Sequence, residues 1–354
     1  MSKKIKCLVF SGGGIRGITY VGCLQALEVF NILPQIECFV GTSVGSIFAL
    51  LLNLGYKYEE LREILLSVDF SSLRDITSDG IFNYFNSYGF ETGNKLERII
   101  RIFIRKKVEH DNITFQDLFL KTGKNLIITG TCLNTRECEY FNHINNPDMS
   151  VIKAIRISIS IPFVFIAPKI GSKLYVDGGV IENYPLNAYD DKDEILGFLL
   201  KDKIGSKDIE GLDEYSLAIV QCIDNKLYEL YQMLYSNITI TINTEIGVLD
   251  YAISREMKSK LFLLGYEKTI NYLKQHSNRV INDNQENDTS NILSDINKEI
   301  MINTDDKFNG ISIENEFIID TSINHIDLDL ENPIMLDPDN LTMPVIIDIT
   351  TIRL

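Results

Sequence analysis

The sequence predicts an α/β fold with a mostly parallel central sheet and helices on both of its faces. Short, wholly apolar segments, such as residues 5–10 and 195–200, alternate with longer segments of helical pattern. Continuous apolar strands are typical of parallel sheets, because helices cover both faces of such sheets. Glycine-rich turns follow the first two apolar segments, at residues 11–17 and 41–45. Strands and helices that alternate in this way favour an α/β layer architecture.

The individual elements follow from the hydrophobic pattern. Runs of four to eight apolar or β-branched residues predict strands, and longer apolar or amphipathic segments predict helices. Strands are expected at residues 5–10, 36–40, 125–131, 138–141, 173–177, 195–200 and 238–242. Helices are expected at residues 18–30, 46–54, 151–157, 214–236 and 257–276, with a mostly helical stretch over residues 59–110.

Residues 96–105 separate apolar from basic side chains at helical spacing. The apolar stripe consists of Leu96, Ile99, Ile100 and Phe103, and the other side carries Arg98, Arg101 and Arg105. We interpret this segment as a surface helix with a solvated basic face. The alternative is an interfacial helix that leans on anionic lipid.

Composition divides the chain of 354 residues near residue 277. Residues 1–277 carry 33 acidic and 30 basic side chains, which leaves this part close to neutral. Residues 278–354 carry 16 acidic and 4 basic side chains and are rich in Asn, Asp and Ile. We therefore expect one large domain over 1–277, followed by an acidic C-terminal extension that is partly linker or disordered.

Charge and cysteine content narrow the partners and the setting. A net charge of −15 disfavours nucleic acid, whereas the near-neutral body can approach a membrane phospholipid or another acyl lipid. The six cysteines lack paired metal-ligand spacing, so no metal site is expected, and free buried thiols suggest a reducing, intracellular setting. No signal peptide and no transmembrane segment are recognised, which predicts a cytoplasmic protein that is at most peripheral on membranes.

The first glycine motif lies between a predicted strand and a predicted helix. It spans Gly12, Gly13, Gly14, Ile15, Arg16 and Gly17. Free backbone N–H groups at a helix N-terminus favour negative charge, so the motif fits a dinucleotide pyrophosphate or an oxyanion. A tight turn that binds nothing is the third interpretation. Arg16 fits either a salt bridge that steadies the loop or a contact with a phosphate headgroup.

The second motif decides between these alternatives. A dinucleotide site needs an acidic residue at the end of the second strand, but Gly-x-Ser-x-Gly stands there instead. It is formed by Gly41, Thr42, Ser43, Val44 and Gly45. A serine on a sharp strand-to-helix turn needs flanking residues without side chains, and glycine meets that need. The motif therefore predicts a nucleophilic Ser43.

A nucleophilic serine needs a base that accepts its hydroxyl proton. Four histidines occur, at positions 110, 143, 276 and 325, and none follows a convincing strand beside a glycine. His276 has the sequence order of a triad but ends a polar helix, where a solvated histidine is the simpler interpretation. Asp177 ends a predicted strand and is followed by Gly178 and Gly179. If that strand is parallel to the others, Asp177 lies at the edge of the sheet where active sites gather.

These three motifs, in this order, resemble those of the patatin-like phospholipase family. The segment Ser158–Pro168 also resembles the segment that precedes the aspartate motif of that family. The resemblance runs from about residue 5 to about residue 275. It identifies residues 12–17 as an oxyanion hole, 41–45 as a nucleophile elbow and 177–179 as the aspartate motif.

The resemblance implies a three-layer α/β/α sandwich and hydrolysis of lipid acyl esters, of the phospholipase A or lysophospholipase type. It implies a catalytic pair of Ser43 and Asp177 without histidine, an acyl-enzyme intermediate, and neither a metal ion nor another cofactor. Two alternatives stay open at this point. One is an acyltransferase that uses the same pair, and the other is a non-catalytic member that binds lipid or protein.

Overall fold

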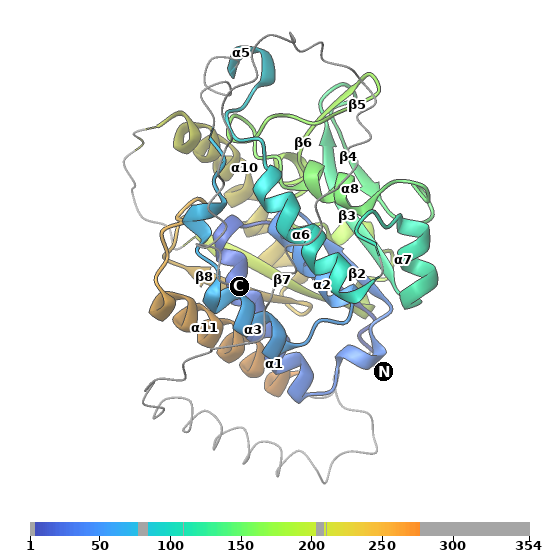
Figure 1. Ribbon diagram of the computed structural model, residues 1–354. Helices are drawn as coiled ribbons and strands as arrows, with labels where there is room; N and C mark the ends of the chain where they lie inside the picture. Colours follow the sequence, from blue (N-terminus) through green and yellow to red (C-terminus); the bar gives the residue numbers. More distant parts are fainter. Residues whose placement is uncertain (1–3, 77–83, 109, 203–208, 210, 277–354) are drawn as a thin grey trace, which may run out of the picture. The chain divides into compact units, whose positions relative to one another are not determined.

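The computed structural model describes residues 4–76, 84–108, 110–202, 209 and 211–276 (Figure 1). The predicted acidic extension, residues 278–354, and its boundary near 277 lie outside these residues. Everything below concerns the described part of the chain.

The described residues form one sheet of eight strands, ordered β5-β6-β3-β2-β1-β7-β8, with β4 also paired to β3. Five strands run parallel: β1 (Cys7–Phe10), β2 (Cys38–Gly41), β3 (Asn125–Cys132), β7 (Ile195–Asp202) and β8 (Thr239–Thr244). Three pair antiparallel: β4 (Glu137–Phe141), β5 (Lys169–Ile170) and β6 (Lys173–Asp177). The seven predicted strands are confirmed, and the two-residue β5 was not predicted.

Helices occupy the connections between these strands (Figure 1). The α-helices are α1 (Thr19–Val29), α2 (Val44–Asn53), α3 (Tyr58–Ser67), α5 (Tyr84–Ser87), α6 (Asn94–Lys107), α7 (Phe115–Thr122), α8 (Val151–Ser158), α9 (Gly179–Glu182), α10 (Leu212–Tyr235) and α11 (Arg255–Gln275). Short 3₁₀ turns are η1 (Gly14–Ile18), η2 (Leu33–Gln35), η3 (Phe70–Leu73), η4 (Leu186–Ala188) and η5 (Lys192–Glu194). The short α7 was not predicted, and α2 begins two residues earlier than expected. No helix within the described ranges is long and apolar enough to cross a bilayer.

Alternate residues of the strands enter two separate cores. Leu8 and Phe10 of β1 pack in the larger core, with residues of α1, α2, α3, α6, α8 and α11. Cys7 and Val9 of the same strand pack in the smaller core, with Tyr184 and with tyrosines of α10. Because side chains along a strand alternate between faces, helices cover both faces of the sheet. The predicted three-layer α/β/α sandwich is confirmed.

Two glycines bring α1 and α11 together in the layer on the larger core. A Cβ at Gly22 would lie 1.8 Å from the carbonyl oxygen of Phe262, and one at Gly265 would lie 2.0 Å from that of Thr19. The two backbones approach each other more closely than any side chain permits. This contact fixes α1, and with it the glycine turn that precedes α1 in the chain.

Candidate active site

Ser43 lies in the turn between β2 and α2. It is the residue before the first turn of α2 and has a φ of +53°, which is uncommon for a residue other than glycine. Its amide donates to the hydroxyl oxygen of Ser158 at 2.9 Å, and its carbonyl accepts from the hydroxyl of Ser46 at 2.6 Å. The buried Thr42 side chain is bonded to Thr129 at 2.7 Å. These contacts hold the strained turn in place.

The flanking glycines are required by the backbone itself. A Cβ at Gly41 would lie 2.2 Å from the carbonyl oxygen of Gly45, and a Cβ at Gly45 would lie 2.4 Å from that of Phe10. A Cβ at Gly17 of the first motif would lie 2.4 Å from a methyl group of Val44. The steric reason given for Gly-x-Ser-x-Gly therefore holds in this turn.

Asp177 reaches Ser43 by a route that the sequence did not predict. β6 pairs antiparallel with β3, so the assumption that Asp177 ends a parallel strand is wrong. The parallel pairing of β2 with β3 places Gly41 opposite Ile128, whereas Asp177 lies opposite Gly130, two residues further along β3. β6 therefore starts beyond the carboxyl edge of the parallel strands and runs back toward the end of β2. Asp177, at its end, arrives just beyond the end of β2.

Ser43 and Asp177 form a buried pair. Their exposed fractions are 6% and 5%, and the Ser43 side chain lies close enough to the Asp177 carboxylate to lower its pKa. The amide of Gly179 donates to Asp177 Oδ1 at 2.7 Å. Burial raises the pKa of Asp177 to about 7, although the Ser43 side chain and the Gly179 amide act in the opposite direction. A Cβ at Gly178 would lie 2.2 Å from Thr129 Oγ1, so that glycine lets the aspartate loop sit against β3.

The first glycine motif lies against this pair. A Cβ built at Gly12 would be 3.2 Å from the Cβ of Ser43. The amide of Gly12 donates to Asn183 O, and the amide of Ile15 donates to Val248 O, both at 3.0 Å. Within the described part of the chain, the amides of Gly13 and Gly14 donate no hydrogen bond. Of the first four residues of the motif, these two thus retain free backbone donors.

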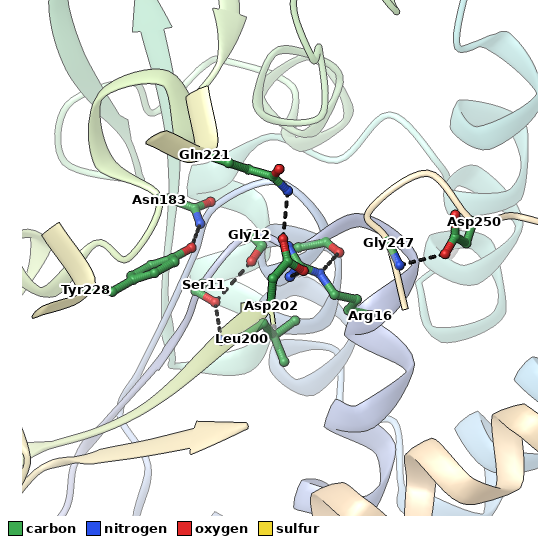
Figure 2. Close-up of polar contacts among 11 residues, drawn as sticks. Ser11, Gly12, Arg16, Asn183, Leu200, Asp202, Gln221, Tyr228, Gly247 and Asp250 are labelled. Carbon is green, nitrogen blue, oxygen red and sulfur yellow. Dashed lines mark hydrogen bonds and ion pairs between the residues drawn. The ribbon is translucent and has the colours of Figure 1, made fainter. Parts of the chain in front are cut away.

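Arg16 supports the motif from behind. Its side chain is 4% exposed, its Nε donates to the carbonyl oxygen of Gly13 at 3.1 Å, and its guanidinium forms an ion pair with Asp202. Gln221 of α10 donates to the other oxygen of Asp202 at 2.9 Å (Figure 2). Of the two interpretations of Arg16, the structure agrees with the salt bridge that steadies the loop.

An apolar cavity of about 140 Å³ opens beside Ser43, between α2, α3 and α6. Its wall includes Ile47, Phe48, Leu51, Leu61, Leu65, Leu96, Ile99, Ile100 and Phe103. Its two charged lining residues, Arg74 and Glu91, pair with each other at 2.7 Å. On the outer side of α6, Arg101 pairs with Glu97 and Arg105 with Asp111. The segment interpreted as a surface helix therefore also forms a cavity wall.

A second, polar cavity of about 50 Å³ lies on the other side of Ser43. It shares Ser43, Gly14 and Ile161 with the apolar cavity. Its charged and polar lining residues are Arg16, Asp177, Asn183, Asp202, Gln221, Asp224, Asn225 and Tyr228. Ser43 thus lies where an apolar and a polar cavity meet.

The histidines are remote from both cavities. His276 is stacked on Tyr272 with ring centroids 4.1 Å apart, and His143 is stacked on Phe119 at 3.8 Å. Of the histidines in the described ranges, none lines either cavity; His325 lies outside those ranges. Likewise, within those ranges no cluster of three His, Cys, Asp or Glu side chains is placed to hold a metal ion.

The sequence analysis missed the residues that β7 and α10 bring to the site. Asp202 is the last residue of β7, a parallel strand whose carboxyl end faces the site, and that position was a usable signal. Asp224, Asn225 and Tyr228 of α10 carry no such signal, because helical spacing alone does not say which face a polar residue occupies.

A serine at a strand-to-helix turn, beside the carboxyl edge of a parallel sheet, is typical of α/β hydrolases that use a serine. Comparisons with known proteins identify the family. A family model described as patatin-like phospholipase matches residues 8–189. An uncharacterised protein of Acanthamoeba polyphaga mimivirus, R571, is 31% identical over 295 residues, covering 79% of this chain and 96% of the relative.

A second relative and a solved structure are also similar to this chain. A probable lipid hydrolase of Invertebrate iridescent virus 6, 463L, is 32% identical over 187 residues, covering 52% of this chain and 63% of the relative. Among solved structures, VipD from Legionella pneumophila aligns with a TM-score of 0.55 at 17% identity, covering 77% of this chain and 67% of VipD. That likeness shows a shared fold. The chain belongs to the patatin-like phospholipase family.

Proposed function

We propose that this protein is a serine-dependent lipid acyl hydrolase of phospholipase A or lysophospholipase type, with Ser43 as nucleophile and Asp177 as base. The observation that carries the proposal is the buried, adjacent pair of Ser43 and Asp177 at the junction of an apolar and a polar cavity. The family and the name of the iridescent-virus relative, a probable lipid hydrolase, support a lipid substrate.

In the first step Ser43 attacks the ester. Asp177 accepts the hydroxyl proton while Ser43 Oγ forms a bond to the acyl carbonyl carbon. An ordinary aspartate, with a pKa near 3.9, is a weak base toward serine. Burial, which raises the pKa of Asp177 to about 7, makes it a better base near neutral pH.

The carbonyl oxygen becomes an oxyanion in this step. The free amides of Gly13 and Gly14 are its donors in our proposal, since those of Gly12 and Ile15 are already bonded within the protein. Such a donor typically lowers the barrier by about 3 kcal/mol. The Arg16 side chain, through its bond to the carbonyl of Gly13, holds the peptide that carries the Gly14 amide.

Collapse of the tetrahedral intermediate completes acylation. The alcohol leaves with the proton held by Asp177, and the acyl group stays on Ser43 Oγ. Asp177 then takes a proton from water, whose oxygen attacks the acyl carbonyl. When the second intermediate collapses, the fatty acid leaves and Ser43 regains its proton from Asp177. Asp177 therefore serves both halves of the reaction.

The apolar cavity is the site for the acyl chain in this scheme. A site for a single water needs at least about 10–15 Å³. A cavity of about 140 Å³ therefore has room for several methylene groups of an acyl chain. Burying each methylene contributes about 0.8 kcal/mol, so the chain supplies much of the binding free energy.

The test is fatty-acid release from vesicles of mixed phospholipids by the wild type and by Ser43→Ala. We expect the variant to lose activity while its thermal unfolding is little changed, because the hydroxyl contributes little to the core. The control is Ser259→Ala, which changes a partly exposed serine of α11 that lines neither cavity and should leave release unchanged. Retention of more than a few per cent of wild-type turnover by Ser43→Ala would exclude Ser43 as the nucleophile.

A further inference from the structure

The polar cavity contains a carboxylate that the reaction scheme leaves unused. Asp224 lies on α10, is 8% exposed, and lines the same cavity as Ser43 and Asp177. Burial, and then the charge of Asp177, raise the pKa of Asp224 to about 7. A buried carboxylate is costly unless hydrogen-bonded, so its surroundings decide whether it has a function.

Three neighbouring donors are directed away from Asp224. Arg16 binds Asp202 and Gly13 O, Gln221 binds Asp202, and Asn183 donates to the Tyr228 hydroxyl at 2.7 Å (Figure 2). Among the residues that the structure describes, none donates a hydrogen bond to Asp224. A donor for this carboxylate must therefore come from whatever enters the cavity.

The charge balance of the cavity points in the same direction. Arg16 is its one basic lining residue and is neutralised by Asp202. Among the lining residues, Asp177 and Asp224 then form no ion pair, although the charge of Arg16 acts on Asp224 and lowers its pKa somewhat. A phosphate placed beside these two carboxylates would be repelled by their charges, and the repulsion is strong at low dielectric. A hydroxyl or ammonium group can instead donate a hydrogen bond to Asp224.

The position of the polar cavity beside Ser43 indicates which part of the substrate enters it. Both cavities open at Ser43, and the apolar one takes the acyl chain in our proposal. The alcohol portion of the ester then faces the polar cavity. A volume of about 50 Å³ accommodates a few water-sized groups, comparable to the atoms next to the ester oxygen rather than to a whole headgroup.

We infer that the polar cavity is the leaving-alcohol subsite and that Asp224 accepts a hydrogen bond there from a hydroxyl or ammonium group of the alcohol. This inference rests on the proposed function. Asp224 is then a specificity-determining residue. It favours esters whose alcohol carries a donor close to the scissile bond and disfavours esters with a phosphate at that position.

The experiment compares kcat/KM for four esters of one acyl chain. These are a monoacylglycerol, with free hydroxyls; an O-acylethanolamine, with an ammonium group; an acyl ester of 2-hydroxyethyl phosphate, with a phosphate and no free hydroxyl; and a p-nitrophenyl ester, whose alcohol has no donor. We expect the wild type to prefer the first two over the phosphate ester by at least tenfold. Asp224→Asn should lose most of that preference and change turnover of the p-nitrophenyl ester by less than twofold.

The ethanolamine arm separates the two donor types. If charge dominates, Asp224→Asn loses more on the ammonium ester than on the monoacylglycerol, and if hydrogen bonding alone dominates, the two losses are equal. Either pattern supports the subsite. An unchanged preference in Asp224→Asn overturns it.

Control variants distinguish a failure of the subsite inference from unfolding and from a failure of the proposed function. Glu229→Gln removes an exposed carboxylate from the same helix and should leave all four rates unchanged. Asp224→Ser provides a second test if Asp224→Asn unfolds, and p-nitrophenyl ester turnover reports folding in each. If Ser43→Ala hydrolyses that ester as fast as the wild type, the proposed function has failed rather than the subsite.

Discussion

The cavity between α2, α3 and α6 and the cavity beside α10 share Ser43 but differ in size and charge. The first measures about 140 Å³, and its two charged lining residues, Arg74 and Glu91, neutralise each other. The second measures about 50 Å³ and contains three carboxylates for one guanidinium. The first therefore suits a hydrocarbon chain, and the second suits a small polar group and the movement of a proton.

The two cavities also differ in how the chain builds them. Residues of α2, α3, α6 and the segments near them form most of the apolar cavity, so one stretch of sequence, residues 44–103, supplies most of its wall. The polar cavity combines the glycine motif with the ends of β6 and β7 and with α10. The pair of Arg16 and Asp202 joins residues that are 186 positions apart. The polar side, where we propose that the proton transfers take place, thus depends on the completed sheet.

The largest effect should come from the base on the polar side. Asp177→Asn keeps the shape of the side chain but cannot accept a proton, so we expect kcat to fall by roughly 10³-fold or more for every chain length. His276→Ala should be close to neutral, because His276 lies at the end of α11 and bonds only the carbonyl of Tyr272. Initial rates on one phospholipid check both. A dead His276→Ala beside an active Asp177→Asn would replace the pair by a histidine-dependent mechanism.

A smaller effect is expected on the stability of the folded protein, through the pKa of the same residue. Because the pKa of Asp177 rises from 3.8 to about 7 on folding, the folded state binds more protons than the unfolded state between these values. Stability then falls as pH rises from about 4 to about 7, by on the order of 1.4 kcal/mol per unit of pKa shift at most. Asp177→Asn removes this penalty.

The variant should therefore unfold at a higher temperature than the wild type at pH 8, and the gain should shrink at pH 5. Each kcal/mol corresponds to about 2–4 °C for a domain of this size. Asp190→Asn changes an exposed carboxylate and should show the same difference from wild type at both pH values. A gain for Asp177→Asn that is independent of pH would mean that burial of the charge is not its cause.

The contrast between the cavities explains which features the sequence could predict. The three glycine motifs are local patterns, because each is recognised from a few consecutive residues, although the atoms that occupy the space beside these glycines come from several parts of the chain. Ser43 and Asp177 could therefore be predicted as site residues from their flanking residues alone. The antiparallel direction of β6 was not, since strand pairing depends on partners far along the chain. Asp224 was missed for the same reason, because only the packing of α10 turns it toward Ser43.

The smallest effect, on the apolar side, tests whether that cavity measures the acyl chain. Leu65 of α3 is partly buried and lines the cavity, so a larger side chain there can extend into empty space without overpacking the core. Leu65→Phe adds three carbon atoms, which should displace two or three methylene groups of a long acyl chain. At about 0.8 kcal/mol for each methylene, kcat/KM should fall by roughly tenfold or more for long chains. Butyryl esters, which do not reach this depth, should be hydrolysed as before.

The matched control is Leu120→Phe, on an α7 side chain that is 72% exposed and lines neither cavity. The measurement is kcat/KM for p-nitrophenyl esters of four to sixteen carbons, with thermal unfolding of each variant. An equal loss at all chain lengths would place the acyl chain outside this cavity and would end the division of roles between the two sides of Ser43.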